Sequence, residues 1–104
     1  MSWIVLIISG VFEAVWATAL GKSEGFSRPL PTVTFVLGLL LSMGGLAWAM
    51  RDLPTGTAYA VWVGIGASLT VAYAMITGTE PFSVLRLLLI LGIVACVIGL
   101  KLLD

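Results

Sequence analysis

The chain has 104 residues, of which 61% are hydrophobic, and its formal net charge is zero. Because the apolar share of an ordinary soluble domain is about 45 to 50%, this composition places the chain in a lipid bilayer. One crossing takes about 20 residues, so four crossings leave roughly two dozen for loops and ends. We therefore expect residues 1–104 to form one transmembrane domain. The charge pattern does not indicate nucleic acid as a partner.

Histidine is absent, and the one cysteine, Cys96, lies inside the last apolar run. This set of residues cannot provide a disulfide framework or a cluster of metal ligands. We interpret Cys96 as a small packing residue and expect neither a metal site nor a cofactor.

Charged residues divide the chain into apolar runs. Nine of the ten lie at the ends of these runs, and only Glu13 lies inside one. In chain order the runs predict helices at about residues 3–20, 31–50, 57–76 and 84–103. The prolines agree with these bounds, because each lies in a connection or a first helical turn, where a missing N–H costs little: Pro29, Pro31, Pro54 and Pro81. The predicted fold class is an all-α membrane protein with four transmembrane helices.

The first predicted helix carries Glu13 near its middle. A carboxylate at the bilayer centre costs on the order of 3 kcal/mol, so its default interpretation is functional. A structural ion pair is the main alternative, but no Lys or Arg of this chain lies at comparable depth. An ionised Glu13 requires a cation and a protonated Glu13 requires none, which is the minimum chemistry of a proton-for-cation antiporter. Gly10 and Trp16 share its helix face and are predicted to border the pocket, where Trp16 offers an indole donor.

Ser42, near the middle of the second predicted helix, has two candidate acceptors. Its hydroxyl can donate to a carboxylate oxygen of Glu13 or, as serines in membrane helices often do, to a carbonyl of its own helix. The sequence leaves both open.

The third predicted helix has an aromatic pair followed by two glycines. Tyr59 and Trp62 are three residues apart and combine a hydroxyl with two ring faces suited to a cation. An interfacial aromatic belt is the competing interpretation, more so for Tyr59 than for Trp62, which lies a turn deeper. Gly64 and Gly66 either mark a hinge that lets the two halves of the helix rock or permit tight packing.

The last predicted helix carries a stripe of small residues. Gly92, Ala95 and Gly99 follow one another at i, i+3 and i+7, which permits close approach of a second helix and makes them a candidate dimer interface. The alternative is the ordinary glycine content of membrane helices. A second copy is expected because four short helices cannot readily shield a carboxylate from lipid and also enclose a water-accessible pocket.

The basic residues are almost balanced between the two membrane sides. Short loops predict that both termini and the loop at residues 51–56 share one side, which carries two basic residues against three on the other. The positive-inside rule therefore gives little bias, and we expect insertion both ways round. Two oppositely inserted copies would supply the inverted repeat that transporters commonly use.

Three segments resemble those of a known family: Gly10-Val11-Phe12-Glu13-Ala14-Val15-Trp16-Ala17, Gly56-Thr57-Ala58-Tyr59-Ala60-Val61-Trp62-Val63-Gly64-Ile65-Gly66-Ala67, and Glu80-Pro81. Along its whole length the chain resembles transporters of the small multidrug resistance (SMR) family. Trp16, with Ser42 and Lys101, resembles the guanidinium exporter subtype, whereas the broad multidrug subtype usually has a small residue where Trp16 stands. The chain departs from the subtype at Lys22, a lysine that commonly comes one residue earlier, and at Trp48, which is commonly polar.

The resemblance implies an antiparallel, dual-topology homodimer in the bacterial inner (cytoplasmic) membrane. Both Glu13 carboxylates would bind either protons or one guanidinium ion, and four residues match the family's pocket positions: Trp16, Ser42, Tyr59 and Trp62. Guanidinium presents parallel N–H donors that fit a carboxylate bidentately, which a quaternary ammonium ion cannot do.

The function expected from the sequence is not enzymatic. It is proton-coupled export of guanidinium, and of small substituted guanidines, by alternating access. One alternative is a broad exporter of hydrophobic quaternary ammonium compounds, which would need a wider pocket than Trp16 indicates. The other is a non-transporting membrane adaptor, in which Glu13 pairs with a basic residue of a different protein.

Overall fold

The computed structural model describes residues 1–103, which form four α-helices. They are α1 (Ser2–Lys22), α2 (Pro29–Ala49), α3 (Thr55–Ile76) and α4 (Val84–Leu103). All four are long and apolar enough to cross a membrane. At 1.5 Å per residue each is about 30 Å long, which is the thickness of the hydrocarbon core. The predicted all-α fold class with four spans is confirmed.

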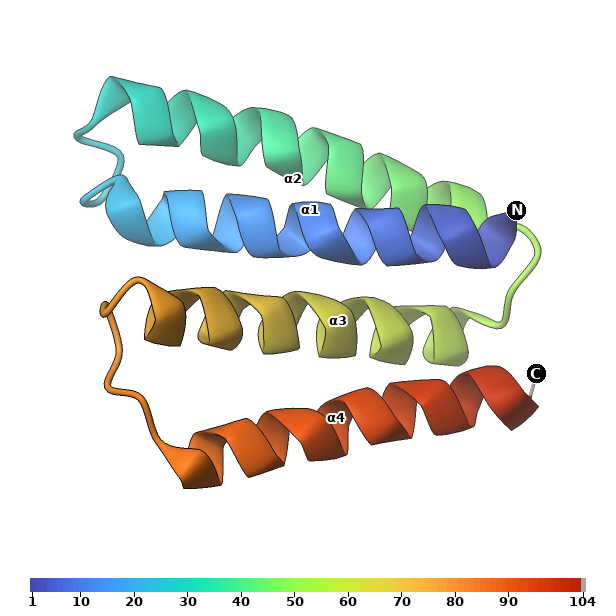
Figure 1. The fold of residues 1–104 in the computed structure, drawn as a ribbon. Helices are drawn as coiled ribbons and strands as arrows, with labels where there is room; N and C mark the ends of the chain where they lie inside the picture. Colours follow the sequence, from blue (N-terminus) through green and yellow to red (C-terminus); the bar gives the residue numbers. More distant parts are fainter. Residues whose placement is uncertain (104) are drawn as a thin grey trace.

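The four helices alternate in direction and lie side by side in the order α2, α1, α3, α4 (Figure 1). α1 packs against both α2 and α3, whereas the backbone of α4 approaches only α3. The chain is consequently a flat slab of 41 × 33 × 17 Å. The N-terminus, the end of α4 and the α2–α3 loop lie at one end of the slab (Figure 1).

Three helices extend by two residues beyond a predicted end, and one of them is α3, which begins at Thr55 rather than at residue 57. α1 continues to Lys22 rather than ending at residue 20, and α2 begins at Pro29 rather than at Pro31. A lysine in the last turn interacts favourably with the helix dipole. A proline in the first turn loses nothing, because that N–H has no partner within the helix. The extensions at Lys22 and Pro29 are therefore stable locally.

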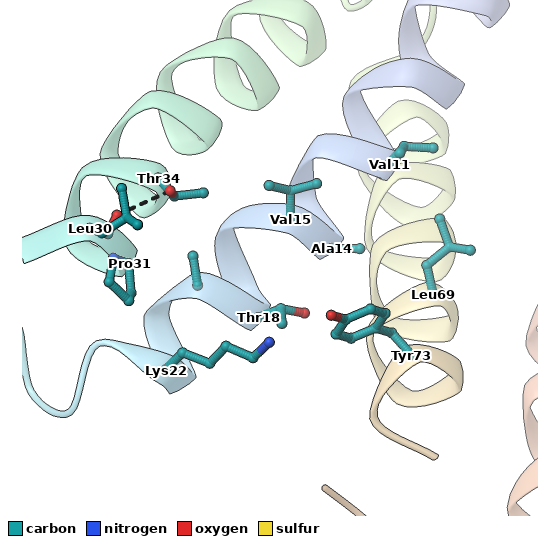
Figure 2. A pocket seen from close by; sticks show the side chains of 11 residues that line it. Val11, Ala14, Val15, Thr18, Lys22, Leu30, Pro31, Thr34, Leu69 and Tyr73 are labelled. Carbon is teal, nitrogen blue, oxygen red and sulfur yellow. Dashed lines mark hydrogen bonds between the residues drawn. The ribbon is translucent and has the colours of Figure 1, made fainter. Parts of the chain in front are cut away.

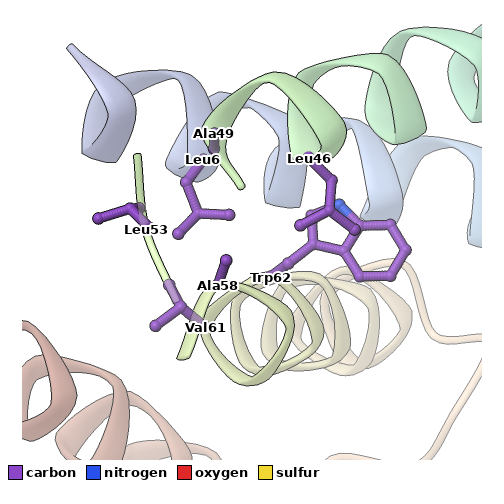
Figure 3. Close-up of a cluster of buried hydrophobic side chains, with 7 residues drawn as sticks. All are labelled: Leu6, Leu46, Ala49, Leu53, Ala58, Val61 and Trp62. Carbon is purple, nitrogen blue, oxygen red and sulfur yellow. The ribbon is translucent and has the colours of Figure 1, made fainter. Parts of the chain in front are cut away.

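The apolar core lies in the half of the slab that holds the N-terminus. It is built from α1, α2, α3 and the α2–α3 loop (Figure 3): Leu6, Leu46, Ala49, Leu53, Ala58, Val61 and Trp62. Burial of these side chains fixes the three helices relative to one another. It therefore also fixes the position of Glu13, two turns along α1 from Leu6.

α4 is the least buried helix and contributes a single buried residue, Ile90. It packs closely against Gly64 of α3, where an added Cβ would lie 2.7 Å from a Val97 side-chain carbon. The stripe of small residues faces away from this contact: Gly92 and Ala95 are exposed, and a Cβ on Gly92 or Gly99 would meet no atom of the other described helices within 4 Å. This surface of α4 is left uncovered by the other three helices.

Candidate functional site

The Glu13 carboxyl lies where α1 packs against α3. It rests directly on the backbone of Gly66, because a Cβ on that glycine would overlap the carboxyl atoms. Glu13 Oε1 is buried and has no hydrogen-bond partner among residues 1–103, and the same is true of the indole nitrogen of Trp16. Buried polar atoms without partners are rare and costly. An acceptor and a donor three residues apart on one helix are thus both left for another group to satisfy.

Glu13 borders a cavity of about 290 Å³ between α1 and α3. The cavity is lined by Glu13, Ala17, Val63, Gly66, Ala67, Thr70 and Val71. The Thr70 hydroxyl donates to the Gly66 carbonyl at 2.7 Å, so it is already engaged. The carboxyl therefore faces small and apolar neighbours, where low dielectric strengthens its attraction for a cation. The volume lies at the lower end of the range for ligand pockets, about 300–1,000 Å³, and suits a small ion.

An aromatic row crosses α2, α1 and α3 through the rings of Phe35, Trp16, Trp62 and Tyr59. Its neighbouring ring centroids are 5.9, 6.5 and 6.0 Å apart in that order. These spacings are typical of favourable ring contacts. Trp62 is 5% exposed and Tyr59 is 55% exposed, so the row leads from the interior of the slab to its surface.

Ser42 connects the aromatic row to α1 by hydrogen bonds. The Trp62 indole nitrogen donates to Ser42 Oγ at 3.0 Å, and the Ser42 hydroxyl donates to the Ser9 carbonyl at 2.7 Å. The acceptor is therefore neither of the two predicted ones, since it is not the Glu13 carboxylate and not a carbonyl of α2. In an α-helix the Ser9 carbonyl also accepts the N–H of Glu13, four residues on. Ser42 thus holds the helical turn that carries the carboxylate.

The other predicted pocket residues do not line the Glu13 cavity within one chain: Gly10, Trp16, Ser42, Tyr59 and Trp62. Gly10 instead allows α1 and α3 to approach, because a Cβ there would lie 2.7 Å from Ile65 Cγ2. The structure therefore brings Trp16, Tyr59 and Trp62 together in the aromatic row, next to the carboxylate cavity rather than in it.

The two glycines of α3 face different neighbours. α3 is one continuous helix through Gly64 and Gly66, of which Gly64 contacts α4 and Gly66 contacts Glu13. The structure has tight packing at both Gly64 and Gly66, which is one of the two interpretations that the sequence allows. The hinge stays a prediction.

Ser9 and Gly45 lie near Glu13 but were not predicted from the sequence to be part of the site. Ser9 is buried, its hydroxyl donates to the Val5 carbonyl at 2.7 Å, and a Cβ on Gly45 would overlap that hydroxyl. This close contact seats α2 against α1 one turn before Glu13. The signal that could have identified Ser9 is its position, because it is a polar residue inside the first apolar run on the same side of the helix as Glu13.

Comparison with known proteins covers nearly the whole chain. The family described as Small Multidrug Resistance protein matches residues 1–100. The chain is 45% identical over 102 residues to the "Guanidinium exporter" of Proteus vulgaris, covering 98% of each protein. It is 48% identical over 102 residues to the "Guanidinium exporter" of Escherichia coli (strain K12), covering 98% of this chain and 97% of the relative. The chain therefore belongs to the small multidrug resistance family.

Proposed function

We propose that this multi-pass membrane protein exports guanidinium, and small substituted guanidines, in exchange for protons. The observation that carries the proposal is the Glu13 carboxyl, whose Oε1 atom is buried without a partner beside a small apolar cavity. The relatives are similar to this chain over nearly their whole length, and their names therefore support guanidinium as the substrate.

Competition for Glu13 provides the exchange. An ionised carboxylate in a low-dielectric cavity requires a cation, and guanidinium can satisfy both oxygens through two parallel N–H donors. A proton that neutralises the carboxyl removes that attraction and releases the ion. If the site opens alternately to the two sides of the membrane, protons entering from one side expel guanidinium to that side.

The transporting unit in this proposal is an antiparallel homodimer in the bacterial inner membrane. The uncovered stripe of small residues on α4 supports a contact with a second copy: Gly92, Ala95 and Gly99. The separation of the Glu13 cavity from the aromatic row within one chain also supports it, because a partner can bring the two regions around a common substrate. The near balance of basic residues favours insertion in both orientations.

Transport by purified protein in liposomes tests the function. Liposomes with an acidic interior should take up guanidinium against its concentration gradient as protons leave. Dissipation of the pH gradient with a protonophore should stop this uptake. Tetraphenylphosphonium and a tetra-alkylammonium ion serve as bulky comparison cations. Robust transport of the bulky cations with no response to guanidinium would support a broad multidrug exporter instead. No transport of any of these cations would favour the adaptor.

Gly66→Ala tests whether the contact beneath the carboxyl matters for binding. The added methyl group would overlap the Glu13 carboxyl and force it out of the cavity. We expect guanidinium affinity to fall at least about tenfold, which corresponds to about 1.4 kcal/mol. Quenching of tryptophan fluorescence in purified protein measures the affinity. The matched control is Gly44→Ala in α2, where a Cβ would meet no atom of another described helix within 4 Å. Unchanged affinity in Gly66→Ala would show that the carboxyl does not bind guanidinium in this position.

A further inference from the structure

A larger cavity of about 570 Å³, which Glu13 does not line, lies between α1, α2 and α3 (Figure 2). It is bounded by α1, the first turns of α2 and the second half of α3, and it shares no lining residue with the Glu13 cavity. Its α1 side is a stripe at helical spacing that ends in Lys22: Val11, Val15, Thr18 and Lys22. We call this cavity the Lys22 groove.

Polar groups converge at one end of the Lys22 groove. The Lys22 ammonium group and the hydroxyls of Thr18 and Tyr73 point toward one another (Figure 2). Lys22 Nζ lies 5.3 Å from the centroid of the Tyr73 ring. No carboxylate lines the groove. Within residues 1–103 the ion pair is that of Arg86 with Glu80, so Lys22 is not in one. The cluster therefore carries a net positive charge and three groups able to donate hydrogen bonds.

The remainder of the Lys22 groove is apolar and belongs to helices that span the bilayer. Leu30 is 76% exposed and Leu69 is 40% exposed, so aliphatic surface continues from the groove to the outside of the slab. Lys22 stands in the last turn of α1, about one bilayer thickness from the helix start, and thus lies at the level of lipid headgroups. A ligand that matches the groove needs a long apolar chain with an anionic group at one end.

We propose that the Lys22 groove binds an anionic phospholipid. An acyl chain lies along the apolar stripe of α1, and a phosphate oxygen accepts from the Lys22 ammonium and from the Thr18 and Tyr73 hydroxyls. Charge complementarity selects an anionic lipid, because a zwitterionic headgroup would add its own ammonium beside Lys22 without a carboxylate to receive it. The lipid and the ligand of Glu13 occupy separate cavities, so this proposal does not depend on the transport function.

Native mass spectrometry of the protein released from nanodiscs tests the proposal. The nanodiscs contain equal amounts of phosphatidylglycerol and phosphatidylcholine with identical acyl chains. We expect wild-type protein to retain phosphatidylglycerol preferentially and Lys22→Gln to retain about fivefold less of it, as expected for loss of one basic residue at a membrane surface. Lys22→Arg should keep the preference. The matched control is Arg28→Gln, which removes the same charge at the same end of the slab but outside the groove.

A second variant separates the groove from general charge attraction. Thr18→Val combined with Tyr73→Phe removes both hydroxyls with little change of shape, and it should reduce phosphatidylglycerol retention while leaving the net charge intact. Equal retention of the two lipids by wild-type protein would overturn the proposal, as would equal losses in Lys22→Gln and Arg28→Gln. Displacement of the lipid by inorganic phosphate would also overturn it, since the site would then be one for small anions. Circular dichroism shows whether each variant is folded.

Discussion

Glu13→Gln should abolish proton-driven guanidinium transport. Glutamine keeps the shape of the side chain but can neither carry a negative charge nor exchange a proton. Removing one partner of a buried charge pair costs about 2–5 kcal/mol, so guanidinium affinity should fall at least about 30-fold. The fold should survive, because the substitution removes a charge from the membrane interior rather than adding one.

Liposome uptake under a pH gradient measures this effect, with helix content checked by circular dichroism. The matched control is Glu24→Gln, which removes a carboxylate from the exposed α1–α2 connection. It should transport like wild type. Full proton-driven transport by Glu13→Gln would contradict the exchange mechanism, because the proton would then have to bind elsewhere.

A copy of the chain locked in one membrane orientation should be almost inactive alone. Two added lysines on one side strengthen the positive-inside bias, which is nearly neutral in this sequence. One locked form carries lysines at the exposed positions Thr55 and Gly56. The oppositely locked form carries them at the exposed positions Ser27 and Thr79, on the other side. If locking leaves about 1% of chains in the minority orientation, only about 2% can join an antiparallel dimer, so transport should fall at least about tenfold.

Co-expression of the two oppositely locked forms should restore transport. Labelling of a cysteine introduced in a loop, in a Cys96→Ala background, reports the orientation of each form. Recovery in the mixture, with neither form active alone, supports the antiparallel dimer. Full activity from either locked form by itself would contradict it and leave a parallel dimer or a monomer as the transporting unit.

The four spans could be predicted because bilayer constraints act on single helices. Charged residues and prolines cannot lie deep in a span without penalty, so their positions bounded each helix to within two residues. The largest differences, of two residues, are at Lys22, Pro29 and Thr55. Lys22 and Pro29 are residues tolerated on either side of a helix boundary. The order α2, α1, α3, α4 across the slab was not predicted, since it depends on which faces pack.

Sequence patterns indicate candidate site residues one at a time, but they do not give the contacts between those residues. Glu13 was identifiable because it is the lone charge inside an apolar run. Periodicity gives the face of a helix that a side chain occupies, but it does not give the axial offset between two helices. That offset places Gly66 beneath the carboxyl and the Ser9 carbonyl in reach of Ser42. Small residues at such crossings give no signal in a single sequence, because glycines without close contacts, such as Gly44, look the same.

The pH dependence of guanidinium binding to purified protein tests competition at Glu13 most directly. A proton and guanidinium that share one carboxylate must weaken each other's binding reciprocally. The dissociation constant should therefore rise by up to about tenfold per shared carboxylate for each unit of acidification once the carboxyl is protonated, and binding in weakly buffered solution should release protons. Binding that does not change with pH and releases no protons would contradict the account.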